Sequence, residues 1–494
     1  ASWLGDKIAA EFQQADAAEA AAVALQRARS AAMRADRLAS ARRIEQPVLS
    51  DDDMGNLFDA ITYEKGQTVL AMFEAWTGPA AFQAGVRRHL QRHAWGNATS
   101  TQFFDALGES DPALPAAVRS FTTQGGIPRL QVQLLCDGGA PRLQLRQSRL
   151  LPLGSPAVPG QLWQLPLRLR TPGGSSRLLM TTPEATLALP DAQCPAWVQA
   201  NADGSGYWRS AQAPGGLLRL AAAPGLSTGE WLALLDDATG LHDAGDLSTR
   251  EALALVQAAA AQSSGEVVQA AAALLRHLGR LGSAGLPGQA ALWQQAFGAR
   301  ARQLGWQPRP GEPLDDRLLR PALLPAVAVL GEDDALRGQA LALARTWLAD
   351  RNSLDADLRL PVLKAAAHAG GPDGGAALFQ RLAGALQAST VRTERGDLLG
   401  ALGQFRQPGL AEQARAVLLQ PQIDLRDSMW PLMRPQADDD TTRGAALDFV
   451  LRHLPALSPR MAREDLAWLP GLFRTGCSAD EARRVDTGLA ATMA

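Results

Sequence analysis

The sequence contains little of what marks several classes of protein. Only three cysteines occur among its 494 residues, Cys136, Cys194 and Cys477, and they lie far apart along the chain. Three cysteines are too few for a disulfide framework, and without a CxxC spacing we expect no cysteine-bound zinc and no thioredoxin-type site. The 48 lysines and arginines nearly balance 50 acidic residues, so the net charge of −2 argues against a nucleic-acid partner.

Long apolar stretches are missing as well. The longest runs, such as 322–330, reach about half of the roughly 18 residues that a membrane span requires, so we expect a soluble chain with no membrane span. The first residue is Ala1, and no signal-peptide pattern comes after it. Few cysteines fit the cytoplasm but do not exclude a bacterial periplasm, so the compartment stays open between these two.

Lysine and tyrosine are scarce. The lysines are Lys7, Lys65 and Lys364, so 45 of the 48 basic residues are arginine, and the tyrosines are Tyr63 and Tyr207. Ala, Arg, Gly and Pro dominate instead, a composition typical of a GC-rich bacterial coding bias. Tyr63 and Lys65 stand only two positions apart, which makes this stretch worth inspection. From spacing alone, we interpret it as a helix N-terminus with a packed tyrosine.

Hydrophobic periodicity divides the chain into parts. Residues 1–124 have the helical period and include an Ala-rich helix at 17–38 without Gly or Pro. Val69, Met72 and Phe73 lie on one apolar face of a further helix. The first part is therefore predicted to be helical.

The period changes to two after residue 125. Leu130, Val132 and Leu134 alternate with polar residues, which is typical of a half-buried strand. Further short strands are expected at 143–145, 165–169, 177–181, 185–189, 196–200 and 206–211. Several short alternating strands at this spacing predict a small antiparallel β-sandwich over 125–220.

The helical period returns over 221–494. Helix pairs recur roughly every 40 residues, which predicts an α-superhelical, HEAT-like domain. The acidic runs Asp51–Asp53 and Asp438–Asp440 are interpreted as loops, the second one solvated. The predicted fold is thus mainly α with a small β-sandwich.

One short motif suggests a serine nucleophile. Gly225–Gly229 matches GxSxG, the nucleophile elbow of α/β-hydrolases, but that elbow needs a buried strand before it and a parallel sheet around it. The strand context here is poor. Ser227 and Glu230 instead fit an S-x-x-E capping box, which we favour, and Thr99 with Gln102 fits another.

One histidine pair has the spacing of metal ligands. His89 and His93 lie four residues apart and could share a helix face. No acidic residue stands between them as a base, and none of the six histidines is followed by Glu, so an HExxH site is absent. We interpret them as packed histidines near Phe82 and Val86, and we predict no metal site within this chain.

The stretch Phe58–Leu107, with its YEKG element at 63–66, resembles the segment after the zinc site in the aminopeptidase N family of zinc (gluzincin) aminopeptidases. Further motifs of that family come later in the chain, in the family's order: Gly96–Thr99, Phe121–Pro128, Trp197–Asn201, Gly206–Arg209, Leu304–Trp306, Pro310–Glu312, Leu319–Arg320, Leu354–Arg359 and Leu399–Phe405. Each motif alone is weak, but the shared order makes the set specific, and the resemblance covers nearly the whole chain.

The resemblance implies three domains. Residues 1–124 would be the C-terminal helical part, or remnant, of a thermolysin-like catalytic domain. Residues 125–220 would form the β-sandwich, and 221–494 the C-terminal superhelical domain that shields and accommodates peptides. Its peptide-contacting residues stay unassigned.

The resemblance also implies a role for Tyr63. In the family, the tyrosine of this element donates a hydrogen bond to the tetrahedral oxyanion beside the metal-bound carbonyl. A phenol stays protonated at neutral pH and can donate, and such a donor helps most where charge develops in the transition state. Zinc would polarise the carbonyl and activate water, with the HExxH glutamate as base.

The family's zinc-binding segments are not in this sequence. Ala1–Leu4 resembles the residues that come directly after the third zinc ligand, so the chain is expected to begin just downstream of it, without the HExxH helix and the GxMEN loop. The resemblance therefore implies the C-terminal portion of an aminopeptidase that removes N-terminal residues from peptides. We expect it to be inactive alone and to need the N-terminal part of the same enzyme as a partner.

A rival interpretation is a non-catalytic helical-repeat interaction module derived from this family. The nucleotide sequence upstream of Ala1 separates the two. An open frame encoding GxMEN and HExxH supports the enzyme, and a start codon near Ala1 supports the module.

Overall fold

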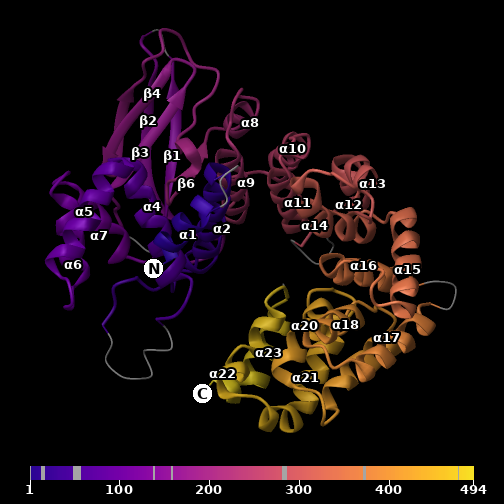
Figure 1. Ribbon diagram of the computed structural model, residues 1–494. Helices are drawn as coiled ribbons and strands as arrows, with labels where there is room; N and C mark the ends of the chain where they lie inside the picture. Colours follow the sequence, from indigo (N-terminus) through magenta and orange to yellow (C-terminus); the bar gives the residue numbers. More distant parts are fainter. Residues whose placement is uncertain are drawn as a thin grey trace. The chain divides into compact units, whose positions relative to one another are not determined.

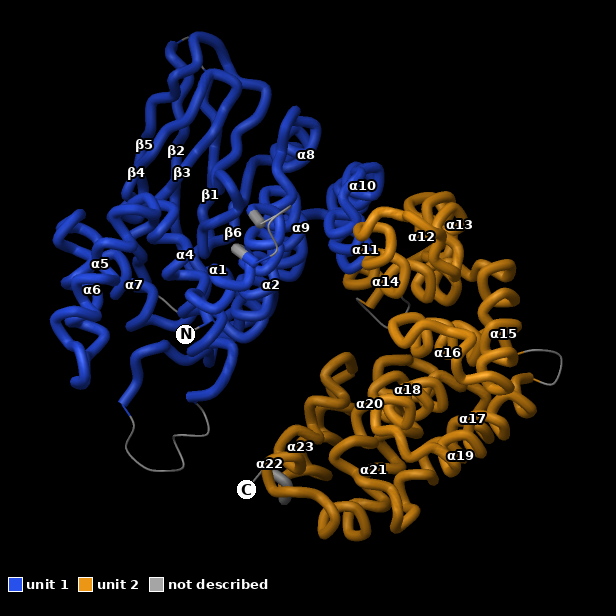
Figure 2. Tube along the Cα trace, in the orientation of Figure 1, with its two compact units in different colours: residues 1–274 blue, residues 275–494 orange. Residues whose placement is uncertain are grey.

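The computed structural model divides the chain into two compact units, residues 1–274 and 275–494 (Figure 2). It describes residues 2–12, 17–47, 57–136, 139–156, 160–280, 286–370, 374–476 and 478–493. The acidic run Asp51–Asp53 and Cys477 lie outside the described residues. None of the helices within the described ranges is both long enough and apolar enough to span a membrane.

The first part of unit 1 is helical, as its periodicity predicts (Figure 1). Its helices are α1 (Ser2–Phe12), α2 (Ala17–Asp36), the π-helix η1 (Ile61–Lys65), α4 (Gly66–Thr77), α5 (Pro79–Arg92), α6 (Ser100–Gly108) and α7 (Leu114–Thr122). Helix α4 buries the predicted face with Val69, Met72 and Phe73. The capping box of Thr99 and Gln102 begins α6, which confirms that prediction.

The strands form two sheets. They are β1 (Ile127–Leu135), β2 (Arg142–Leu150), β3 (Leu165–Thr171), β4 (Gly174–Met180), β5 (Glu184–Ala188) and β6 (Arg209–Gln212). One sheet has the order β5-β2-β1-β6, and β3 pairs with β4 in the other. Leu130 and Val132 are buried in β1 while Gln131 and Gln133 are exposed, so the predicted alternation separates the two faces of the strand.

The larger sheet is mixed, which corrects the prediction of a purely antiparallel arrangement. Strand β6 runs parallel to β1, with Arg129 opposite Arg209. A parallel neighbour requires a long crossover connection, and the chain makes one through β2 to β5 before it returns to the free edge of β1. The strand expected at 196–200 is only an isolated bridge between Arg170 and Gln199.

Cys136 and Cys194 form a disulfide, contrary to our expectation from their distance in sequence. Register explains the error. Leu135, Arg142 and Ala188 lie side by side across β1, β2 and β5, so the segments after β1 and β5 emerge at the same end of the sheet. Closing a loop of this length stabilises a fold by roughly 4 kcal/mol in the chain-entropy treatment. Disulfides persist in oxidising compartments, which removes the argument that few cysteines favour the cytoplasm.

The helical period after the sheets is confirmed. Unit 1 continues with the 3₁₀ helix η2 (Ala202–Gly204), α8 (Gly216–Ala221), α9 (Thr228–Asp243), α10 (Thr249–Ala260) and the first part of α11 (Gly265–Leu278). The predicted domain boundaries after residues 124 and 220 stay predictions, because both lie within the single compact unit of residues 1–274.

Unit 2 contains only helices among its described residues. They are α12 (Gln289–Trp293), η3 (Gln294–Gly298), α13 (Ala299–Leu304), α14 (Leu314–Leu330), α15 (Asp334–Ala349), α16 (Ala356–Ala369), α17 (Ala376–Ala388), α18 (Arg392–Leu402), α19 (Pro408–Ala416), η4 (Val417–Leu419), α20 (Leu425–Ala437), α21 (Arg443–Leu457), η5 (Ser458–Arg460), α22 (Arg463–Ala467), η6 (Leu469–Phe473) and α23 (Ala479–Met493).

Ion pairs in unit 2 recur at the spacing of its helix pairs. The separations in sequence are 43, 38, 35 and 36 residues for Arg351–Glu394, Arg359–Asp397, Arg392–Asp427 and Asp448–Arg484. These pairs form a ladder in which a side chain on one helix pair reaches the next pair. The ladder matches the predicted repeat of roughly 40 residues, although no strict sequence repeat accompanies it.

Acid is expected to destabilise unit 2 through His368 on α16. Its Nε2 lies 3.3 Å from Oε1 of Gln404, and burial, with nearby Arg406, lowers the pKa of His368 from 6.5 to about 4. Between these two values the unfolded chain binds more protons than the folded chain, so the free energy of unfolding falls as the pH falls. The contribution of the neutral imidazole is therefore complete above about pH 6.5 and is lost toward pH 4.

We predict that His368→Gln makes the stability of the chain less dependent on pH. Between pH 7 and 4 the wild type should lose about 1–3 kcal/mol more than the variant, because the variant has no imidazole to protonate. Denaturant unfolding of both proteins at the two pH values measures this difference. Equal losses in the two proteins would show that His368 does not titrate in this way.

Candidate functional site

Tyr63, the predicted catalytic residue, lies on the π-helical turn η1. The backbone N–H of Lys65 donates to the carbonyl oxygen of Ala60 at 3.0 Å, an i to i−5 bond. The Tyr63 side chain is 41% exposed, and its ring centroid lies 6.3 Å from that of Phe58. Its hydroxyl has no hydrogen-bond partner among the described residues. Tyr63 is therefore accessible at the surface of unit 1.

The N-terminal end of η1 is held by a carboxylate. Oδ1 of Asp59 accepts hydrogen bonds from the backbone N–H groups of Ile61 and Thr62, at 3.0 and 3.1 Å. Arg42 pairs with Asp59 and donates to Oγ1 of Thr62 at 2.7 Å. These bonds satisfy donors that a helix start otherwise leaves without partners, so this end of the turn is tied to the loop after α2.

The C-terminal end of η1 is held by a buried ion pair. Nζ of Lys65 lies 2.9 Å from Oδ2 of Asp36, and both side chains are fully buried. The ammonium also donates to the carbonyl oxygen of Gln124 at 3.0 Å. Burial lowers the pKa of Lys65, and Asp36 opposes that change. Removing the ion from water is costly, so its partners must be close and well placed.

Asp36 also binds two other segments. Its Oδ1 accepts from the backbone N–H of Gly126 at 2.7 Å, and its Oδ2 accepts from the Tyr207 hydroxyl at 3.0 Å. Gly126 has φ 103°, a conformation that favours glycine. Burial, then the charge of Asp36, raises the pKa of Tyr207 well above its usual value. Asp36 thus joins the YEKG element, the segment at 121–128 and the motif at 206–209.

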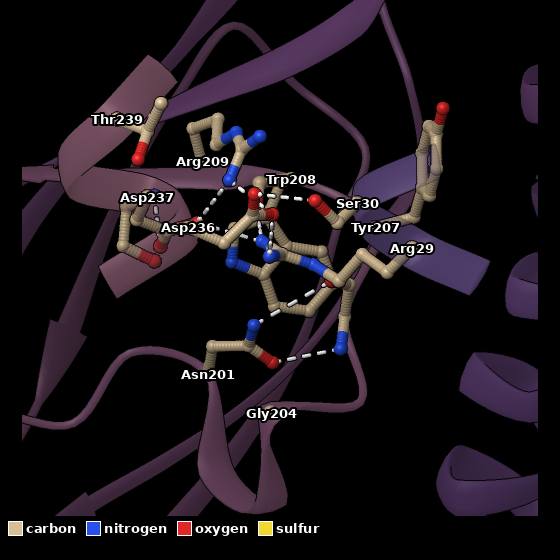
Figure 3. Close-up of polar contacts among 12 residues, drawn as sticks. Arg29, Ser30, Asn201, Gly204, Tyr207, Trp208, Arg209, Asp236, Asp237 and Thr239 are labelled. Carbon is tan, nitrogen blue, oxygen red and sulfur yellow. Dashed lines mark hydrogen bonds and ion pairs between the residues drawn. The ribbon is translucent and has the colours of Figure 1, made fainter. Parts of the chain in front are cut away.

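A second buried cluster lies on the same helix, at Arg29 (Figure 3). The Arg29 guanidinium lies 2.9 Å from Asp236 and 2.7 Å from Asp237 on α9, and Nε donates to the carbonyl oxygen of Gly206 at 3.0 Å. Arg209 approaches the same two carboxylates, at 2.5 and 3.4 Å. Burial alone disfavours ionisation of Asp236, but the two arginines outweigh it and hold the pKa of that carboxyl below its usual range.

These two clusters belong to one face of α2. Arg29, Ala32, Met33 and Asp36 are all buried, at the spacing i, i+3, i+4 and i+7. Sequence reasoning identified the helix but missed its two buried charges. A signal was present, since Asp36 ends the helix where the dipole disfavours an acidic side chain.

Ser227 has a structural position. It is the N-cap of α9, and its side chain and that of Glu230 complete the predicted capping box. Glu230 is buried and also pairs with Arg170 at 2.6 Å. The capping-box interpretation is confirmed, and the GxSxG match carries no nucleophile elbow.

His89 and His93, the pair with the spacing of metal ligands, pack against each other and against a neighbouring ring. The rings of His89 and His93 lie 5.1 Å apart, and His89 packs edge-on against Phe103. Within the described ranges, neither histidine belongs to a group of three metal-ligating side chains.

The run Asp438–Asp440 is not simply solvated, which corrects our interpretation. Its carboxylates pair in order with Arg434, Arg406 and Arg443.

Comparison with known proteins identifies the family. Residues 1–124 match the peptidase family M1 domain, and residues 197–492 match the ERAP1-like C-terminal domain. The chain therefore belongs to peptidase family M1, the aminopeptidase N family.

Several curated relatives are aminopeptidases. Aminopeptidase M1 of Arabidopsis thaliana is 26% identical over 427 residues, which are 81% of this chain and 47% of that protein. Aminopeptidase 2 of Candida albicans is 25% identical over 406 residues, 79% of this chain and 43% of that protein. Tricorn protease-interacting factor F2 of Thermoplasma volcanium is 29% identical over 179 residues, 36% of this chain and 21% of that protein. The chain spans about half the length of the first two relatives.

We predict that Arg29→Met destabilises the chain by about 3–5 kcal/mol, because it leaves the buried Asp237 and the half-buried Asp236 with only Arg209 as a charged partner. The matched control is Arg27→Met on the same helix. Arg27 is exposed and pairs with Glu266, so its loss should change the free energy of unfolding by less than about 1 kcal/mol. Denaturant unfolding measures both. If the two substitutions lower the free energy of unfolding equally, the ion pairs of Arg29 do not stabilise the chain more than a surface pair does.

Proposed function

We propose that this chain is the C-terminal portion of a zinc-dependent aminopeptidase that removes N-terminal residues from peptides. Family membership supports the peptidase class. The observation that carries the assignment is the position of Tyr63: it is accessible, it belongs to the YEKG element, and its hydroxyl lacks a partner among the described residues.

The role we propose for Tyr63 is to donate a hydrogen bond to the oxyanion of the tetrahedral intermediate. A phenol hydroxyl remains protonated at neutral pH and offers one donor. Its contribution depends on a fixed direction, because a preorganised donor needs no rearrangement when charge develops. A turn held at both ends by Asp59 and Lys65 supplies that rigidity.

Zinc is the cofactor of M1 aminopeptidases in general, but this chain does not carry the family's zinc-binding motif. The sequence contains no HExxH, and His89 and His93 lack a third ligand among the described residues. The zinc ligands and the catalytic glutamate would therefore have to be supplied by polypeptide outside this chain.

We propose that the N-terminal part of the same enzyme covers an apolar face of unit 1. On α1, Leu4, Ile8 and Phe12 recur every four residues and are between 48% and 83% exposed, and Phe58 beside Tyr63 is 66% exposed. A helix face of this kind normally packs on another element. The share of the relatives that this chain leaves uncovered is long enough to supply a covering domain.

Tyr63→Phe in the complete enzyme tests the catalytic role. The substitution removes one hydroxyl and leaves the ring, so folding should change little. Loss of one oxyanion donor typically costs about 2.7–4 kcal/mol, or roughly 100- to 1,000-fold in kcat. KM should change much less, because the lost interaction is made in the transition state.

Steady-state kinetics measure this effect, and thermal melting of the variant controls for folding. A kcat within about threefold of the wild type, far from the loss of an oxyanion donor, would show that the role belongs to another residue.

The 494-residue chain alone should neither retain stoichiometric zinc nor hydrolyse aminoacyl substrates. Metal analysis after dialysis and a turnover assay check this. Co-expression with the upstream polypeptide should restore both and improve the solubility of the chain. One zinc per chain together with turnover in the isolated protein would mean that its ligand set lies in this sequence after all.

A further inference from the structure

The burial of Lys65 calls for an explanation beyond stability. Its side chain is fully buried against Asp36, although lysine is among the residues least often buried. A buried ion pair is a poor source of net stability, because apolar side chains of similar volume usually serve as well. What an ion pair adds is specificity, because the 2.9 Å contact is kept only while the two segments hold their present positions.

The Asp36–Lys65 pair fixes the orientation of η1, and this orientation determines the direction in which Tyr63 faces. Residues two apart on a helical turn do not share a face, so burying Lys65 places Tyr63 on another side of η1. The exposed fractions agree, at 0% for Lys65 and 41% for Tyr63. In a different register of this turn, the side chains of Lys65 and Tyr63 would both face other directions.

The register of η1 is open to change, because it is a π-helical turn. A π turn contains one residue more than an α turn, and such turns are rare and frequently occur at functional sites. Here Lys65 and Glu64 both donate through their backbone N–H groups to the carbonyl oxygen of Ala60, at 3.0 and 3.1 Å. The backbone bonds alone therefore leave the choice between the two registers poorly determined.

We propose that the buried Asp36–Lys65 ion pair is a positioning device, which holds η1 in its π register and thereby aims the Tyr63 hydroxyl. Asp36 suits this task because it is fixed from other directions, by the Gly126 N–H at 2.7 Å and the Tyr207 hydroxyl at 3.0 Å. Neither Asp36 nor Lys65 touches substrate in this proposal, and both act through Tyr63. The inference rests on the function proposed for Tyr63 but also makes a structural claim of its own.

The structural claim can be tested on the 494-residue chain without activity. The chain has only two tyrosines, so uniform labelling with 3-fluorotyrosine gives two ¹⁹F resonances, and Tyr63→Phe assigns them. The test variant is the double substitution Asp36→Asn with Lys65→Met, which removes both charges and so avoids an unpaired buried ion that would unfold a single variant. Circular dichroism and thermal melting establish that the double variant is folded.

We expect the Tyr63 resonance of the folded double variant to move by more than its linewidth toward its position in the urea-unfolded chain. The matched control is Arg170→Met, which breaks the ion pair with Glu230 in the same unit and should leave the Tyr63 resonance unchanged. The Tyr207 resonance is not diagnostic, because its hydroxyl contacts Asp36 directly. An unmoved Tyr63 resonance in the folded double variant would overturn the proposal.

A kinetic arm separates this inference from the function on which it rests. In the complete enzyme, the double variant should lower kcat at least tenfold, with KM within about threefold, since misplacing a group by about 1 Å costs up to 100-fold. In a Tyr63→Phe background the same substitutions should lower kcat no further, because the donor that they aim is gone. If the double substitution lowers kcat by the same factor in the Tyr63→Phe background, the ion pair affects catalysis by a route that does not involve Tyr63.

The outcomes for the two proposals are distinguishable. If Tyr63→Phe leaves kcat unchanged, the oxyanion role fails, while the ¹⁹F shift still decides whether Asp36 and Lys65 position the turn. If Tyr63→Phe lowers kcat and the ¹⁹F resonance does not move, the catalytic role stands and the positioning role is wrong.

Discussion

Neutralisation of charge inside unit 1 determines how its segments are arranged. Helix α2 carries Arg29 and Asp36 on one buried face, and an unpaired ion in such surroundings costs several kcal/mol. Each charge therefore requires partners, and α2 has none of its own to offer. They come from α9, from η1 and from the segments that lead into β1 and β6. The turn η1 ends at Lys65, which is the partner of Asp36. The requirement therefore also affects the position of Tyr63, which lies on the same turn.

The sequence predicts well the features that depend on neighbours along the chain. Both capping boxes, the buried face of α4 and the alternation in β1 were predicted correctly, because each depends on residues at most seven or eight positions apart. The resemblance to the aminopeptidase N family was confirmed as well. The candidate site was located only through that resemblance, since periodicity marked Tyr63 as an ordinary packed tyrosine.

Contacts between distant segments were beyond prediction. Asp36 meets Tyr207 across 171 positions, and Arg29 meets Asp237 across 208. Hydrophobic periodicity identifies the apolar face of a helix. A charged residue on that face only weakens the pattern, and the pattern does not indicate which distant residue it contacts. The Cys136–Cys194 disulfide and the parallel pairing of β6 were missed for the same reason: both depend on the register of a sheet whose strands are separated by long connections.

The ladder of arginine–carboxylate pairs in unit 2 has a mechanical consequence. Each pair joins one helix pair to the next, as in Arg359–Asp397 and Arg392–Asp427, and several of these pairs are partly exposed. Exposed ion pairs weaken as salt screens them, whereas the apolar contacts between the helices do not. In an array whose repeats contact only their neighbours, the resistance to bending should therefore fall as ionic strength rises, while each helix stays intact.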